Sequence, residues 1–232
     1  MAETSYGQFC PVAMAAEILG ARWTLILLRE LVVGSTRFNE LRRGLPKMSP
    51  ALLSKRLKEL ESAKVVRRVP VKGEPGTFEY RLTEAGWALK PVIEAIGSWG
   101  QRWVDLEASL QNLDVDLLMW DMRRNIDPRP MPCKRSVIEI IFNNLPAARR
   151  RWWLVVEPGK EVDLCSVDPG FEVDLYLSTD LRTMTEIWMG SLPLGRARDQ
   201  GKLSVTGSRE LERAIGSWLV LSPFARVEKQ VA

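Results

Sequence analysis

Residues 22–82 carry a succession of short apolar repeats that is compatible with few folds. Apolar side chains recur at three- and four-residue spacing in three segments, which predict helices at residues 22–33, 37–43 and 49–62. Two alternating runs then flank the turn Gly73-Glu74-Pro75-Gly76 and predict a β-hairpin, with strands at residues 65–69 and 78–82. Short helices followed by a hairpin are the order of elements in a winged helix-turn-helix.

The third of these helices has one apolar side and one small, basic side. Ser49 can cap its N-terminus, and Pro50 suits the first helical position because it has no amide hydrogen to leave unpaired. At 100° per residue, the leucines at positions 53, 57 and 60 share one side. The other side holds Ala51, Ser54, Lys55, Lys58 and Ser62. A solvated helix has the same pattern, but the neighbouring helices and hairpin favour insertion into a DNA groove.

Positive charge is concentrated in this region. Residues 37–81 contain 12 Lys or Arg and 5 Asp or Glu, whereas residues 111–232 contain 17 of each. This excess predicts that a polyanion, double-stranded operator DNA, binds the first half of the chain. The expected DNA-binding residues are Arg37, Arg42, Arg43, Lys47, Ser49, Ala51, Ser54, Lys55, Lys58 and Lys72. Lys72 lies at the hairpin tip, where it can reach the minor groove or its phosphates; Arg67 and Arg68 fit plain solvent exposure equally well.

A longer apolar repeat follows the hairpin. Its members alternate three and four residues apart, as in a seam between helices, and are Leu89, Val92, Ile96, Trp99, Trp103, Leu106, Leu110 and Leu113. Pro91, Gly97 and Gly100 interrupt the repeat and predict a kink or two helices. The seam can pack against its own domain. We prefer a homodimer, because a two-fold axis pairs two recognition helices on DNA.

Pattern and charge change near residue 110, which predicts two domains. We expect a DNA-binding and dimerisation domain over residues 1–110, a linker with a proline-rich stretch over 111–134, and a second domain over 135–232. Short β-rich runs with intervening turns predict an antiparallel sheet, with strands at residues 137–142, 152–156, 162–165, 173–177 and 203–206. With helices at 180–189 and 208–218, the whole chain is predicted to be α+β.

The second half is rich in bulky apolar residues. Most of them should form its core. A small sheet covered by helices can also enclose an apolar cavity, and the candidate lining residues are Phe142, Trp153, Trp188, Met189 and Trp218. An apolar small molecule is then the expected effector, although this domain can equally serve only to enlarge a dimer interface.

Several functional classes are disfavoured by what the sequence lacks. It contains no histidine, the usual general base and the commonest zinc ligand, and its three cysteines are too far apart for a short-spaced metal motif. No glycine-rich phosphate loop is present. We therefore expect no metal, no cofactor and no enzymatic activity. Without a long apolar run or a signal-like N-terminus, the sequence predicts a cytoplasmic protein that does not enter a membrane.

Three segments together resemble the HxlR-type family of bacterial transcription regulators, which is related to the MarR winged-helix group. The segments are CPVAMAAEILGARWTLILLREL, FNELRRGLPKMSPALLSKRLKELESAKVVRR and FEYRLTEAGWALKPVIEAIGSWG. The resemblance covers residues 10 to about 103. It implies a homodimer that binds operator DNA, usually as a repressor, with the helix from Ser49 as the reader and the hairpin as the wing.

The same resemblance draws attention to Cys10. Family members often carry a cysteine near the N-terminus that in some of them senses oxidants or electrophiles, and Cys10 occupies that place. A helix N-terminus favours the reactive thiolate. A small buried apolar residue at a helix start is an equally consistent interpretation of Cys10.

Residues 135–224 resemble the sterol carrier protein type 2-like fold. The similarity lies in GFEVDLYLSTDLRTMTEIWMGSLPL and GKLSVTGSRELERAIGSWL, and it implies an apolar tunnel between sheet and helices. The expected function is therefore a dimeric transcription regulator whose DNA binding responds to an apolar ligand or to oxidation of Cys10. The alternative is a hydrophobic-ligand or lipid carrier that uses its winged helix for protein contacts, but such contacts do not require the positive charge of residues 37–81.

Overall fold

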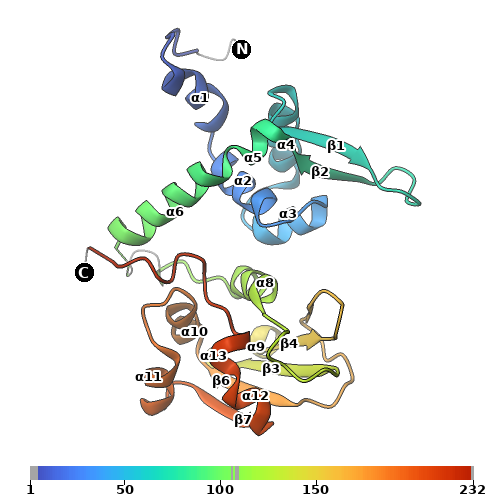
Figure 1. Cartoon of the computed structure of the whole chain (residues 1–232), viewed down its shortest axis with the longest axis vertical. Coiled ribbons are helices and arrows are strands. Elements are labelled where there is room, and N and C mark those ends of the chain that lie inside the picture. Colours follow the sequence, from blue (N-terminus) through green and yellow to red (C-terminus); the bar gives the residue numbers. More distant parts are fainter. Residues whose placement is uncertain (1–4, 106, 108–109, 231–232) are drawn as a thin grey trace. The chain divides into compact units, whose positions relative to one another are not determined.

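The computed structural model describes residues 5–105, 107 and 110–230 (Figure 1). The chain forms two compact units, residues 1–97 and 98–232, and each is considered by itself. Leu106 of the predicted seam lies outside the described residues. Over the described ranges, no single helix has the length and apolar character to cross a membrane; α1 and α2 together reach that length, but they are bent by 83°.

Unit 1 contains a group of helices and one antiparallel hairpin. The helices are α1 (Pro11–Leu19), α2 (Thr24–Val32), α3 (Phe38–Gly44), α4 (Pro50–Ser62), α5 (Glu84–Trp87) and the first part of α6 (Lys90–Trp103). The strands β1 (Val66–Pro70) and β2 (Phe78–Leu82) pair with Val66 opposite Leu82. The predicted winged helix-turn-helix is confirmed.

The core of unit 1 explains the orientation of α4. Leu53, Leu57 and Leu60 are buried against leucines of α2 and α3 and against the base of the hairpin. Ser49 caps the helix, because its Oγ accepts a hydrogen bond from the Leu52 amide at 3.3 Å. The predicted division of α4 into a core side and an outward side is confirmed.

A buried carboxylate connects α2 with α3. Glu30 is fully buried and accepts hydrogen bonds from the Ser35 hydroxyl at 3.1 Å and from Arg29 at 2.5 Å. Arg29 also donates to the backbone carbonyl of Gly44 at 3.3 Å. Gly44 leaves room for this carboxylate, since a Cβ there would lie 1.9 Å from Glu30 Oε2. The network thus fixes the angle between the two helices that precede α4.

The apolar stretch after the wing is divided into two helices, but not at the residues that we expected to interrupt it. The break falls at residues 88–89, between α5 and α6. Pro91 is the second residue of α6, where its missing amide hydrogen leaves no intrahelical bond unmade. Gly97 and Gly100, which we also expected to interrupt the repeat, lie inside α6.

Unit 2 is built around a sheet with the strand order β5-β4-β3-β6-β7. The strands are β3 (Ser136–Phe142), β4 (Arg151–Val156), β5 (Asp163–Cys165), β6 (Leu175–Thr179) and β7 (Ser204–Gly207). The helices are α8 (Val115–Asn125), α9 (Ala147–Arg150), α10 (Leu181–Trp188), α11 (Leu194–Asp199), α12 (Arg209–Arg213) and α13 (Ile215–Trp218). The described chain is thus α+β.

The sheet of unit 2 is mixed, which corrects the predicted antiparallel sheet. β3 pairs antiparallel with β4 but parallel with β6, with Ile138 opposite Leu175. Short turns imply antiparallel pairing only between strands that are also neighbours in space. The chain between β5 and β6 crosses to the free edge of β3, so β6 pairs with a strand that is not its predecessor.

Helix α8 occupies part of the segment that we expected to be a linker. Its Val115, Leu118, Met119 and Met122 are buried in the core of unit 2. Asp114 caps the helix by accepting hydrogen bonds from the amides of residues 116 and 117 at 3.0 and 3.2 Å. The apolar spacing of three, one and three residues is helical, so this segment belongs to a folded unit.

Candidate DNA-binding surface

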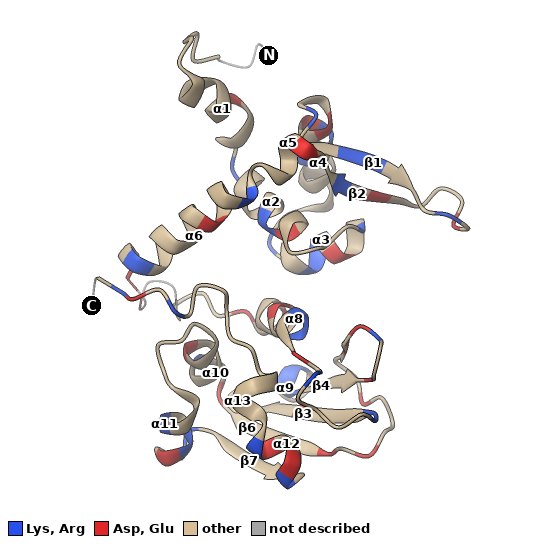
Figure 2. Ribbon diagram, in the orientation of Figure 1, with Lys and Arg blue, Asp and Glu red and all other residues tan. Residues whose placement is uncertain are grey.

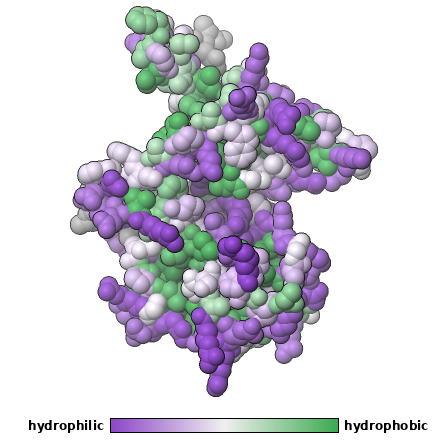
Figure 3. Space-filling view, viewed as in Figure 1, coloured by the Kyte–Doolittle hydropathy of each residue, from purple (hydrophilic) through white to green (hydrophobic). Residues whose placement is uncertain are grey.

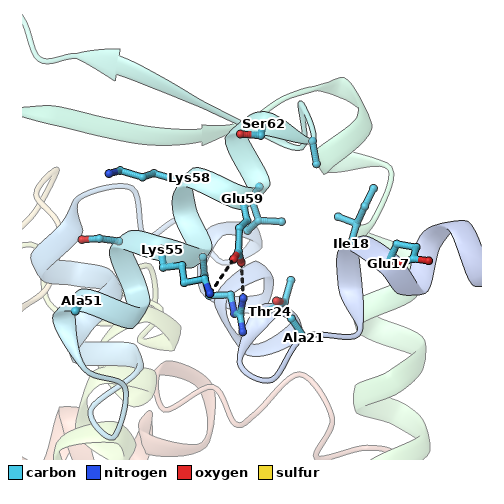
Figure 4. A pocket seen from close by; sticks show the side chains of 13 residues that line it. Glu17, Ile18, Ala21, Thr24, Ala51, Lys55, Lys58, Glu59 and Ser62 are labelled. Carbon is cyan, nitrogen blue, oxygen red and sulfur yellow. Dashed lines mark hydrogen bonds and ion pairs between the residues drawn. The ribbon is translucent and has the colours of Figure 1, made fainter. Parts of the chain in front are cut away.

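The outward side of α4 borders an open groove. Ala51, Lys55 and Lys58 are exposed, and Ser54 is half-buried. The groove has a volume of about 760 Å³, and residues from the end of α1, among them Ile18, line its opposite wall. Figure 4 shows Lys58 extending from α4 away from Ile18 and Glu17 of α1. Small side chains and exposed lysines on one helix side are suited to a DNA groove and its phosphates.

Two residues of this groove, Arg56 and Glu59, were not among the predicted site residues. Glu59 forms ion pairs with Arg56 and, at 3.8 Å, with Lys55 (Figure 4). Arg56 also donates from Nε to the backbone carbonyl of Arg22 at 3.3 Å. The three- and four-residue spacing to Glu59 is visible in the sequence, whereas the contact with Arg22 is not. Lys58 makes no hydrogen bond or ion pair with any residue that the structure describes.

The remaining predicted cations of unit 1 lie around α4. Arg42 and Arg43 occupy the last turn of α3, Lys47 lies between α3 and α4, and Lys72 lies at the wing tip; all four are exposed. Figure 2 shows the Lys and Arg positions on α3, β1 and β2. Their exposure leaves these side chains accessible to a polyanion.

Arg37 lies next to two carboxylates of the wing. It precedes α3, and its Nη2 lies 2.8 Å from Oε1 of Glu74 at the wing tip. Its Nε lies 3.9 Å from Oε1 of Glu79. The structure therefore joins Arg37 to the wing in the absence of DNA.

Cys10 is exposed at the N-terminus of α1. The interpretation of Cys10 as a buried apolar residue is therefore wrong. Hydrogen bonding from the backbone amides of Ala13 and Val12 lowers the pKa of its thiol below the ordinary value. By contrast, burial raises the pKa of the half-buried Cys165 thiol. Cys10 thus has the accessibility and the electrostatic environment of a reactive thiol.

Most of the five candidate pocket residues of unit 2 belong to its packed core. Phe142 and Trp218 are fully buried in the packed core, and the indole of Trp218 donates to the Leu211 carbonyl at 2.8 Å. Trp188 is also part of this core, and Met189 packs against it. Trp153 follows the core residue Trp152 along β4 and so faces the other side of the sheet. A ligand pocket lined by all five residues stays a prediction.

The family is settled by comparison with known proteins. A sequence model of the HxlR-like helix-turn-helix family matches residues 18–108. YvaP of Bacillus subtilis, an HTH-type transcriptional regulator of uncharacterised function, is 40% identical over 99 residues, which are 42% of this chain and 92% of YvaP. The chain belongs to the HxlR-like helix-turn-helix family.

Other similar proteins match a comparable share of the chain. YdeP of Bacillus subtilis, also an uncharacterised HTH-type transcriptional regulator, is 42% identical over 96 residues, which are 41% of this chain and 75% of YdeP. The structure of the oxidized redox regulator HypR is 36% identical and covers 40% of this chain and 95% of HypR, with a TM-score of 0.38. The family match ends at residue 108, so the resemblance of residues 135–224 to a sterol carrier domain stays a prediction.

Proposed function

We propose that this HxlR-like protein is a non-enzymatic transcription regulator that binds operator DNA through α4 and the wing. The observation that carries the proposal is the division of α4, whose leucines are buried while Ala51, Lys55 and Lys58 are exposed. A helix packed in this way presents a narrow, basic side that fits the major groove. The surrounding excess of positive charge supplies the salt-dependent part of the affinity.

The contacts fall into two groups in this proposal. Ser54, Lys55 and Lys58 approach base edges and the groove walls, with Ala51 and Ser49 letting the start of α4 come close to the DNA. The other cations contact phosphates on either side, and they are Arg42, Arg43, Lys47 and Lys72. Phosphate contacts position the protein, whereas contacts of α4 with bases give the sequence preference.

Homodimerisation is supported by unpartnered apolar surface on two helices. On α6, Trp99 is 62% exposed and Ile96 is 44% exposed. Phe9, just before α1, is 98% exposed, and Val12, on α1, is 76% exposed. Figure 3 shows apolar side chains on the surface of α1. Large apolar side chains at this exposure mark an interaction surface. We infer that a second copy covers them, which brings two α4 helices to two operator half-sites.

Regulation through Cys10 is part of the proposal. Its exposed thiol lies on α1, beside the apolar residues assigned to the dimer interface, so oxidation there would alter the pairing of the two copies. We infer repression as the outcome of operator binding, as the family resemblance implies. An apolar ligand in unit 2 has weaker support, because Phe142 and Trp218 fill the space between sheet and helices. The same packing disfavours a lipid carrier.

The proposal is tested by selecting bound fragments from the source genome with the purified full-length protein and sequencing them. The proposal expects a small set of promoter fragments with a shared, two-fold symmetric sequence. Binding to these fragments should weaken steeply as salt rises, while their preference over random duplex is retained. Retention of random fragments alone, or affinity that does not depend on salt, contradicts the proposal.

A further inference from the structure

The side chain of Arg37 reaches from the start of α3 to the tip of the wing. Its Nη2 and Nη1 donate to the two carboxylate oxygens of Glu74 at 2.8 and 3.1 Å. Two parallel bonds of this kind fix the orientation of a guanidinium as well as its position. Glu79 of β2 lies 3.9 Å from Nε and completes what we call the wing latch, formed by Arg37, Glu74 and Glu79.

The backbone of Arg37 is held as firmly as its side chain. The carboxylate of Glu40 accepts hydrogen bonds from the amides of Thr36 and Arg37, both at 2.9 Å. The amide of Tyr80 donates to the Thr36 carbonyl at 2.8 Å, and Arg37 forms a bridge with Glu79. Residues 36–37 therefore extend the wing sheet beside β2, and Arg37 lies at the junction of the wing with α3.

The wing tip itself has little other support. Gly73 and Gly76 have φ values of 84° and 81°, and a Cβ at either position would meet nothing within 4 Å. The backbone hydrogen bonds of the tip, such as that from the Thr77 amide to the Glu74 carbonyl at 3.0 Å, connect tip residues to one another. These bonds hold the shape of the turn but do not connect it to the helices. The ion pair of Glu74 with Arg37 makes that connection.

We propose that Arg37 is a positioning residue that holds the wing tip through Glu74, so that Lys72 is placed on the DNA beside the site of α4. This inference rests on the proposed function and replaces the expectation from the sequence that Arg37 binds DNA, because Arg37 then contacts the wing and not a phosphate. The surrounding carboxylates agree with this role, since Glu74 raises the pKa of Arg37 above its ordinary value. A phosphate contact would instead need Arg37 to leave Glu74.

Hydrogen exchange in the DNA-free, full-length protein tests the latch directly. Arg37→Gln and Glu74→Gln each remove the ion pair and keep the side-chain length similar. We expect the amides of residues 71–77 to exchange roughly 3-fold faster in both variants, the scale of an exposed ion pair, while those of α4 stay unchanged. Lys72→Gln, an exposed cation of the same tip, is the control and should leave exchange as in the wild type. Unchanged exchange at the tip in both latch variants overturns the proposal.

Operator binding then separates positioning from direct contact. If Arg37 acts through the wing latch, Arg37→Gln and Glu74→Gln each weaken operator binding by a similar factor, roughly 3-fold. The double variant then binds the operator no more weakly than either single variant. The charge-exchanged variant, Arg37→Glu with Glu74→Arg, restores part of the affinity. Lys72→Gln, by contrast, reduces the slope of log affinity against log salt by about 1, as expected for a phosphate contact.

The direction in which Glu74→Gln changes operator affinity distinguishes a positioning role of Arg37 from a phosphate contact. If Glu74 merely competes with phosphate for Arg37, its removal tightens operator binding, and the positioning role is refuted. A wild-type protein that binds no DNA refutes the proposed function instead, and the hydrogen-exchange result still decides whether the latch exists.

Discussion

Arg56 connects the middle of α4 to the turn between α1 and α2, where the carbonyl of Arg22 accepts a hydrogen bond from its Nε at 3.3 Å. The next residue, Trp23, has a φ of 80°, a left-handed conformation that a bulky side chain rarely adopts. A backbone held in that region needs support from its surroundings. Arg56, itself paired with Glu59, is one such support and couples the position of α1 to that of the recognition helix.

The Arg56 contact gives a first prediction. Arg56→Gln should lower the free energy of unfolding by about 1 kcal/mol, because the Arg22 carbonyl loses its donor. Operator affinity should fall as well, since α4 loses a fixed point against the α1–α2 turn. Urea denaturation and a binding titration at fixed salt measure the two effects. Lys58→Gln is the stability control, and equal stability of both variants contradicts the role given to Arg56.

Dimerisation through α6 gives a second prediction. Ile96→Asp should convert the dimer to a monomer in sedimentation experiments, because a carboxylate in a buried apolar interface loses its hydration. Operator affinity should fall by about 10-fold or more, since two half-sites are no longer bound together. Val167→Asp is the matched control, since Val167 is an apolar residue of unit 2 that is 75% exposed. A dimer that persists in Ile96→Asp places the interface elsewhere.

The three cysteines give a third prediction, based on pH. A thiol reacts as its thiolate, and the thiolate fraction rises as pH passes upward through the pKa. Because the pKa is lowered at Cys10 and raised at Cys165, Cys10 should be alkylated faster at neutral pH. The difference between the two alkylation rates should narrow as the pH rises and the Cys165 thiol also ionises. Mass spectrometry of iodoacetamide-treated protein over a pH series measures both rates.

The regulatory role of Cys10 is checked separately. Peroxide should alter operator binding by the wild type but not by Cys10→Ser, while Cys133→Ser, at another exposed cysteine, should respond as the wild type does. An identical response of Cys10→Ser and wild type removes Cys10 from the mechanism.

The packing of Gly44 gives a fourth prediction. In Gly44→Ala the new methyl group would lie 1.9 Å from the buried Glu30 carboxylate, which has no room to move without losing Ser35 or Arg29. We expect a loss of roughly 1–3 kcal/mol in the stability of unit 1. Gly100→Ala is the control, because it lies inside α6 with nothing within 4 Å of the new atom. Thermal unfolding of the two variants, monitored by circular dichroism, measures this difference in stability.

The first half of the chain was predictable because its signals are local. Ser49, Pro50 and the spacing of three leucines locate α4, and the structure begins and ends that helix at the predicted residues. The hairpin follows from two alternating runs on either side of a glycine-rich turn. Each of these patterns depends on residues within one element, where propensity and burial agree.

Features that depend on distant partners were not predictable in the same way. The parallel pairing of β3 with β6 joins strands that are not consecutive in the sequence. The alternation of apolar and polar residues within a strand does not show which strand pairs with it. Arg37 was expected to bind DNA because it is basic and close to α4. Its partner Glu74 lies 37 positions further along the chain, so no local pattern indicates the ion pair. The helical spacing of α8 was present in the sequence, but the proline-rich stretch after it led us to begin the second domain at residue 135, after α8 instead of before it.

The central claim is that the outward side of α4 enters DNA, and Lys58 tests it most directly. Lys58 lies on that side without a partner among the described residues, whereas Lys55 is already 3.8 Å from Glu59. Operator binding should therefore weaken in both Lys58→Ala and Lys55→Ala, more strongly in the former, with the salt slope reduced by about 1 and the unfolding free energy unchanged. Wild-type affinity and slope in both variants, measured on the selected operator over a series of salt concentrations, would contradict the account.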